Sequence, residues 1–292
     1  MNGKAQAVSH GAATIVNAIA LGKGAAFGVA LSTKAEISLT DDPGVITGEI
    51  TSDPAESTAL IEKTVTRVFQ HFKVEKRFGA KVLTWSDIPI ARGLKSSSAA
   101  ANAVALATVA ALGETLDELE IVKLSVEAAF DAKVTVTGAF DDACASYFGG
   151  AVVTNNLKRK LVKRFTLPKG LTILFLVPEQ KAYTIDSEVN RLRLVKPLVK
   201  IAYKEAQKGK FWDALSLNGV IYSAAFGYDA SAALDALAAG AVAAGLCGKG
   251  PAVTAVVADD KVDAVKQALQ RHEGAILQTC LNHEKAKVIT QR

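Results

Sequence analysis

The order of strand-like and helix-like segments constrains the fold of this chain more than any other feature of its sequence. Segments with strand composition and segments with helical periodicity follow one another in mixed order. A doubly wound parallel sheet requires regular alternation of strands and helices, which is missing here. We therefore predict an α+β protein of two domains, residues 1–160 and 161–292, joined between residues 155 and 170.

The pattern predicts individual elements along both halves. Strands are expected at 26–31, 35–39, 81–85, 151–154, 161–165, 171–177, 252–257, 275–279 and 285–290. Helices are expected at 55–72, 97–112, 116–131, 142–147, 188–207 with a kink or break at Pro197, 211–223, 231–244 and 261–272. Two alanine-rich stretches, 99–112 and 232–247, look superficially like membrane spans. The first is too short and Asp235 interrupts the second, so we predict buried helices instead.

The composition argues against nucleic acid and membrane as partners. Half of the 292 residues are apolar and 22% are charged, so a sizeable core can form. The net charge of +5 is scattered, and its densest cluster, residues 158–164, is typical of a solvated face. Three cysteines without metal-ligand spacing, and no leader sequence, favour a cytoplasmic protein with reduced thiols.

Residues 89–100 carry the strongest chemical signal. A glycine that permits close backbone approach is followed by a lysine and three serines at the start of an alanine-rich helix. Unpaired amide groups at such a helix start attract anions, so this segment predicts a phosphate-binding loop. The alternative is a simple serine N-cap. The predicted loop consists of Pro89, Ile90, Ala91, Arg92, Gly93, Leu94, Lys95, Ser96, Ser97, Ser98 and Ala99.

The common nucleotide-binding patterns are absent from the sequence. Gly22-Lys23-Gly24 is not followed by serine or threonine, so it is not a Walker-type loop. No Gly-x-Gly-x-x-Gly precedes a helix, which argues against a dinucleotide site.

Three ordered segments resemble the motifs of the GHMP kinases, the family of galactokinase, homoserine kinase and mevalonate kinase. Residues 89–100 resemble the family's phosphate loop, residues 142–150 the segment with the catalytic aspartate, and residues 245–253 the C-terminal glycine-rich motif. Lys95 stands where most members have glycine. The segment that contains Lys95, together with residues 137–146 and 11–20, resembles the corresponding segments of the archaeal-type shikimate kinase branch.

The resemblance implies a ribosomal-protein-S5-like N-terminal domain and a ferredoxin-like C-terminal domain, with the active site between them. It also implies ATP and Mg²⁺ as cofactors, and phosphorylation of the 3-hydroxyl group of shikimate. Asp142 would accept the hydroxyl proton, and Lys95 would stabilise charge on the transferred group. Asp141 is the alternative base, although neighbours on a turn point apart and one of the two acids could merely cap the helix.

The resemblance further implies ligands for metal and substrate. Magnesium would bind the hydroxyl of Ser97, or alternatively Ser98, and a carboxylate on the preceding helix. Asp131 fits that carboxylate by spacing and Glu127 by residue type. The predicted substrate-binding residues are Asn17, Lys23, Asp142, Arg191, Gly248, Lys249 and Gly250. Lys23, Arg191 and Arg92 are candidates for gripping a substrate carboxylate.

Two other functions remain open at the level of sequence. The same fold could act on another alcohol, such as homoserine or mevalonate, because fold does not fix substrate. A non-catalytic member could bind a nucleotide or metabolite as a sensor, although Asp142, Lys95 and the three serines argue against that. The oligomeric state is not predicted.

Overall fold

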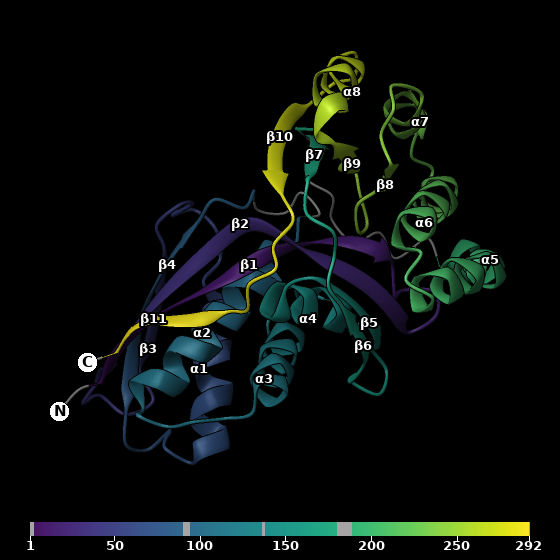
Figure 1. The fold of residues 1–292 in the computed structure, drawn as a ribbon. Coiled ribbons are helices and arrows are strands. Elements are labelled where there is room, and N and C mark those ends of the chain that lie inside the picture. The colour runs from purple at the N-terminus through teal and green to yellow at the C-terminus, as the bar shows by residue number, and fades with distance from the viewer. Residues whose placement is uncertain (1–2, 90–93, 136–137, 180–188, 292) are drawn as a thin grey trace.

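Two β-sheets organise the chain, and the computed structural model describes residues 3–89, 94–135, 138–179 and 189–291 (Figure 1). The seven-stranded first sheet contains β1 (Lys4–Val16), β2 (Lys23–Thr40), β3 (Ile46–Ile50), β4 (Gly79–Ser86), β5 (Ala151–Asn155), β6 (Lys160–Phe165) and β11 (Lys287–Gln291). Its order is β11-β1-β2-β4-β3, and β5 pairs with both β2 and β6.

The long strand β2 occupies the place of two strands expected at 26–31 and 35–39. A register shift opposite it, between His10 and Gly11 of β1, lets β2 continue without a break. Residues 24–29 are all buried, because this half of the strand is covered on both faces. From Leu31 onward buried and more exposed residues alternate, as expected for a strand covered on one face.

Four helices belong to the first domain: α1 (Ala59–Phe72), α2 (Ser96–Ala111), α3 (Glu118–Asp131) and α4 (Phe140–Phe148). The central helix α2 contacts β1, β2, α1, α3 and α4. Half of its 16 residues are alanine, and small side chains let neighbouring backbones approach closely. This explains why the expected helix at 97–112 is buried on nearly every side.

The second sheet contains β7 (Leu171–Val177), β8 (Ala243–Leu246), β9 (Val253–Ala258) and β10 (Ala275–Cys280) in the order β10-β7-β9-β8. Its helices are α5 (Val189–Gln207), α6 (Phe211–Phe226), α7 (Ser231–Ala238) and α8 (Val262–Leu269), with a short 3₁₀ turn, η2, at Asp259–Lys261. Strand–helix–strand–strand–helix–strand with this order is the ferredoxin-like arrangement. Within the described ranges, no helix is long and apolar enough to cross a bilayer.

The domain boundary needs correction. β6 pairs with β5, and β11 pairs with β1, so residues 160–165 and 287–291 both belong to the first sheet. A division into residues 1–160 and 161–292 therefore cuts the β5–β6 hairpin and misplaces the last strand. The second domain is an insertion between two parts of the first.

One helix prediction in the second half is also wrong. The expected helix at 231–244 ends at Ala238, because Gly240 adopts a positive φ of 103° and the chain then forms β8. The alanine-rich stretch 232–247 is thus a helix followed by a strand. At Pro197 the expected kink or break does not end the helix, and α5 continues through it.

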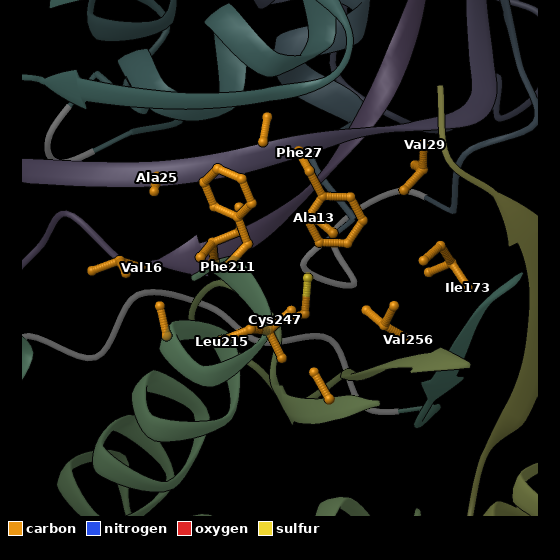
Figure 2. Close-up of a cluster of buried hydrophobic side chains, with 14 of the residues drawn as sticks. Ala13, Val16, Ala25, Phe27, Val29, Ile173, Phe211, Leu215, Cys247 and Val256 are labelled. Atoms are coloured by element: carbon orange, nitrogen blue, oxygen red, sulfur yellow. The ribbon is translucent and has the colours of Figure 1, made fainter. Parts of the chain in front are cut away.

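A shared hydrophobic core joins the two domains (Figure 2). Phe27 of β2 points toward Phe211 and Leu215 of α6, and its ring meets Trp212 edge-on with the ring centroids 5.6 Å apart. Cys247, just after β8, packs into the same cluster. Because the strand alternates, Ala26 packs on the opposite face, in the core around α4. Buried side chains from both domains therefore hold the domains together.

Candidate active site

A cavity of about 470 Å³ lies where the two domains meet. The start of α2, the first turn of α4, the end of β1 and the turn after β8 all contribute to its wall. The structure thus brings together predicted site residues that are far apart in sequence. Those that line the cavity are Asn17, Lys95, Ser96, Ser97, Ser98, Asp141, Asp142, Gly248, Lys249 and Gly250.

The serines at the start of α2 do not act as its N-cap. The N-cap position is Lys95, and its side chain makes no capping hydrogen bond. Its carbonyl oxygen accepts the amides of Ser98 and Ala99, at 3.1 and 3.2 Å. Ser96, Ser97 and Ser98 line the cavity instead, at the positive end of the helix. The alternative of simple serine capping is therefore wrong.

Lys95 has a left-handed backbone conformation, with φ 63° and ψ 30°. This conformation suits glycine and costs other residues about 1 kcal/mol or more. It explains why a glycine fits this position in most GHMP motifs. Here the lysine side chain reaches Asp142, with Nζ 2.9 Å from Oδ2. Backbone strain at a non-glycine residue is typical of functional sites.

The Lys95–Asp142 pair lies in a nearly closed environment. The side chains are 15% and 7% exposed. Burial alone would lower the pKa of Lys95, but the negative potential of Asp142 with Cys247 and Asp141, and the hydrogen bond to Asp142, reverse this, so the pKa is raised. The lysine stays charged. The other oxygen of Asp142, Oδ1, is buried without a hydrogen-bond partner among the described residues.

The unpartnered oxygen of Asp142 defines what the pair can do. Buried polar atoms are nearly always hydrogen-bonded, and a catalytic role is one explanation for an exception. A carboxylate that lines the cavity, with one oxygen held by a lysine and the other without a partner, is suited to accept a proton from a bound hydroxyl group.

Asp141 points to a different partner, as expected for neighbours on a first helical turn. Its Oδ1 accepts a hydrogen bond of 2.8 Å from Nδ2 of Asn156, and its side chain is buried. Burial and the nearby charge of Asp142 raise the pKa of Asp141 to about 7. Of the two acids, Asp142 is the one paired with lysine, and Asp141 is bound to a neutral amide.

Asn17 connects the two domains. Its Nδ2 donates to the carbonyl of Gly248 at 2.7 Å, and its Oδ1 accepts the amide of Ile19 at 2.9 Å. Its own amide donates to Oδ1 of Asn218 at 3.0 Å, and its carbonyl accepts from the hydroxyl of Tyr222. The side chain predicted to contact substrate is therefore used to position the glycine-rich turn. Asn218 and Tyr222 were not predicted from sequence, since neither lies in a motif.

Lys249 adds a second positive charge to the cavity. Its side chain is partly buried, and burial lowers its pKa, as does the nearby charge of Lys95, while Asp142 acts in the opposite direction. Two ammonium groups and one paired carboxylate make a site suited to an anion.

Several predicted residues lie elsewhere. Lys23 at the start of β2 and Arg191 in α5 are exposed and are not among the residues that line the cavity. Pro89 and the buried Leu94 belong to the predicted loop but do not line the cavity. Ile90, Ala91, Arg92 and Gly93 lie outside the described residues.

The predicted metal carboxylates are engaged in ion pairs. Arg67 donates to both oxygens of Asp131, at 2.5 and 2.7 Å, and Arg159 donates to Glu127 at 2.5 Å. Neither acid lines the cavity, whereas Ser97 and Ser98 do. The described residues contain no group of three or more histidine, cysteine, aspartate or glutamate side chains that could hold a metal ion. The hydroxyls fit a magnesium site, and Asp131 as placed does not.

The cavity continues beyond the phosphate loop. Polar residues from the strands and from the α1 and α3 sides line this extension: Thr33, Glu56, Ser57, Thr84, Ser86, Ser125, Lys133 and Thr135. They were missed at the level of sequence because they are single residues on separate elements, with no shared spacing. Their arrangement leaves room for more than a phosphate group.

Comparison with known proteins agrees with this geometry. The family model for the GHMP kinases N terminal domain matches residues 59–150. Shikimate kinase of Methanosarcina mazei is 46% identical over 282 residues, covering 96% of this chain and 95% of the relative. Shikimate kinase of Pyrococcus abyssi is 43% identical over 268 residues, covering 91% and 95%.

Solved structures confirm the two-domain GHMP kinase fold. Homoserine kinase from Cytophaga hutchinsonii aligns with a TM-score of 0.75 at 18% identity, over 98% of this chain and 97% of that chain. Galactokinase of Lactococcus lactis aligns with a TM-score of 0.77 at 15% identity, over 97% and 95%. These two likenesses concern the fold alone, whereas the archaeal relatives match in sequence along nearly their whole length. The chain belongs to the GHMP kinase family, in the group of the archaeal shikimate kinases.

Proposed function

We propose that this protein is a shikimate kinase, which transfers the γ-phosphoryl group of ATP to the 3-hydroxyl group of shikimate. The full-length similarity to archaeal shikimate kinases supports the substrate. The observation that carries the chemistry is the buried Lys95–Asp142 pair at the start of α2, in which Oδ1 of Asp142 is buried and has no hydrogen-bond partner among the described residues. Three free cysteines are compatible with action in the reducing cytoplasm.

In the proposed reaction Asp142 accepts the proton of the 3-hydroxyl group while the oxygen of that hydroxyl attacks the γ-phosphorus of ATP. The bond from the γ-phosphorus to the β,γ-bridging oxygen breaks, and ADP leaves. General-base catalysis of this kind contributes about 10²–10⁴-fold in rate. Lys95 and the amides at the start of α2 stabilise the negative charge of the phosphoryl group in the transition state. Lys249 lines the cavity, whereas Arg191 and Lys23 do not, so we assign Lys249 to an anionic group of one of the substrates.

Magnesium fits the start of α2 through the hydroxyl of Ser97, with Ser98 as the alternative. Mg²⁺ neutralises phosphate charge, and in kinases it commonly retains waters and binds phosphate oxygens directly, so one protein hydroxyl is a sufficient anchor. We do not assign Asp131 or Glu127 to the metal, since arginines hold both carboxylates.

A coupled assay of ADP release tests the proposed function. The purified chain is incubated with ATP, Mg²⁺ and, separately, shikimate, homoserine, mevalonate or galactose. Turnover is expected with shikimate and not with the other three alcohols. Asp142→Asn, which keeps shape and removes the base, is expected to reduce kcat by at least about 10²-fold while ATP binding survives. Preferred turnover of another alcohol would overturn the substrate, and near-normal turnover by Asp142→Asn would overturn the base.

A further inference from the structure

Asp141 is a buried acid that the proposed reaction does not use. Its side chain is 3% exposed and lies in the first turn of α4, beside Asp142. Asn156 donates to its Oδ1, and the Oδ1 of Asn156 in turn accepts from the hydroxyl of Thr154 at 2.7 Å. This chain of hydrogen bonds fixes the carboxyl group in one orientation.

Gly24 makes room for this carboxyl group. A Cβ atom at Gly24 would collide with Oδ2 of Asp141, although Gly24 itself does not adopt a positive φ. The second glycine of Gly22-Lys23-Gly24 is therefore explained by the side chain it accommodates, not by a turn. The carboxyl group of Asp141 in α4 therefore packs directly against the backbone of β2 at Gly24.

The charges around Asp141 do not provide it with a counterion. Lys95 is already paired with Asp142, and no ion pair to Asp141 occurs among the described residues. The titratable groups that face it from the surrounding elements are Lys95 before α2, Asp142 and Cys144 on α4, and Tyr222 on α6. Lys249 faces Lys95 and Asp142 from the turn after β8.

We propose that Asp141 is a positioning residue that remains a neutral carboxylic acid while nucleotide is bound, and that its ionisation weakens binding of the triphosphate. It acts through the charge of the Lys95–Asp142 pair and does not itself contact the phosphates. When Asp141 is neutral, the two ammonium groups of Lys95 and Lys249 face only one nearby carboxylate, that of Asp142. Ionisation adds a second buried carboxylate, which competes with the phosphates for those ammonium groups.

The direction of the pH dependence follows from the environment. Burial and the charge of Asp142 raise the pKa of Asp141 to about 7, while Asn156 and Lys95 act against this. Asp141 is therefore protonated below that pH and ionised above it. One extra charge within a cavity of this kind changes anion affinity roughly tenfold. This inference rests on the proposed binding of ATP in the cavity.

The first measurement follows Asp141 directly and needs no ligand. Carboxyl ¹³C resonances of labelled aspartates are followed by NMR from about pH 5 to about pH 9 in the full chain. One resonance is expected to titrate near 7 and to be missing from the spectrum of Asp141→Asn. Asn156→Ala, which removes the donor that favours the ionised form, is expected to shift this midpoint upward. If all aspartates titrate below about pH 5, near their ordinary values, the proposal is overturned.

The second measurement connects ionisation to binding. Calorimetry gives the Kd of a non-hydrolysable ATP analogue with Mg²⁺ at about pH 6 and about pH 9. The wild-type Kd is expected to rise roughly tenfold more over this interval than that of Asp141→Asn. Asp263→Asn, the same change at an exposed position on α8, is the matched control and is expected to follow the wild type. Equal pH dependence in wild type and Asp141→Asn would overturn the proposal.

Stability provides a third readout that an unrelated structural role would not reproduce. A carboxyl group whose folded-state pKa is raised stabilises the fold below its unfolded pKa, and this contribution is lost as the pH rises through the folded value. Asp141→Asn is therefore expected to raise Tm relative to wild type, and to do so more at about pH 9 than at about pH 5. If no analogue binds any variant, the proposed nucleotide site fails, while the NMR titration still decides the state of Asp141.

Discussion

At the scale of single residues, the departure of Lys95 from the family pattern is the most informative feature. A lysine in a left-handed conformation carries a backbone cost that glycine avoids. The ion pair between its side chain and the buried carboxylate of Asp142 offsets that cost. Position 95 therefore contributes both the turn into α2 and a positive charge next to Asp142.

Replacing Lys95 separates these two contributions. Lys95→Ala and Lys95→Gly both leave Asp142 without its ion pair, so both are expected to lose about 3–5 kcal/mol of stability and at least about 10²-fold in kcat. Lys95→Gly also relieves the left-handed strain, and is expected to be about 1 kcal/mol more stable than Lys95→Ala. Urea unfolding and steady-state kinetics measure both effects. Equal stability of the two variants would contradict the assignment of strain.

At the scale of elements, the ion pairs between α1 and α3 explain where the sequence misled the metal assignment. The spacing of Asp131 from Asp142 matches the family motif, but spacing does not show that Arg67 of α1 faces the same carboxylate. Arg67 also lies 3.8 Å from Glu127. These contacts depend on the packing of two helices that are far apart in sequence.

Asp131→Asn tests this assignment. Because the pair is partly exposed and Glu127 remains near Arg67, the expected loss of stability is below about 1 kcal/mol. The Mg²⁺ concentration that gives half-maximal activity is expected to stay unchanged. The measurements are urea unfolding and a magnesium titration of ATP turnover. A large increase in the required Mg²⁺ would show that Asp131 leaves Arg67 to bind the metal.

Elements with strong local signals were predictable, and those decided by tertiary packing were not. The helix at 96–111 and the loop before it follow from the alanine run and the glycine, lysine and serine residues that precede it. Strand β8 was missed because Ala243–Leu246 has no strand propensity and is held by pairing with β9. The extension of the cavity could not be predicted from the sequence either, because its lining residues come from β2, β4 and the α1 and α3 sides, which are far apart in sequence.

At the scale of the whole molecule, Asn17 joins the domains at the site itself. Its side chain holds the carbonyl of Gly248, and the amide of Gly248 donates to the hydroxyl of Thr14 at 3.1 Å. The glycine-rich turn of the second domain is thus attached to the end of β1 in the first. The active site depends on this connection as well as on the hydrophobic core below it.

Asn17→Ala is expected to weaken both stability and catalysis. Loss of the buried hydrogen bonds to Gly248 and Ile19 costs about 1–3 kcal/mol, and kcat/KM falls because the turn with Lys249 is no longer held in place. Lys23→Ala, on the same hairpin but exposed, is the control and is expected to change neither quantity appreciably. Denaturant unfolding and kinetics compare the two. A loss of activity in Lys23→Ala would restore its predicted contact with substrate.

The return of the chain to its first sheet has a consequence during synthesis on the ribosome. β11 pairs with β1 through residues 287–291, so this strand pair cannot form until residues 287–291 emerge. Until then β1 presents unpaired backbone groups, the kind of exposed edge that promotes aggregation. Strand β1 therefore gains this partner only from residues that are translated long after it.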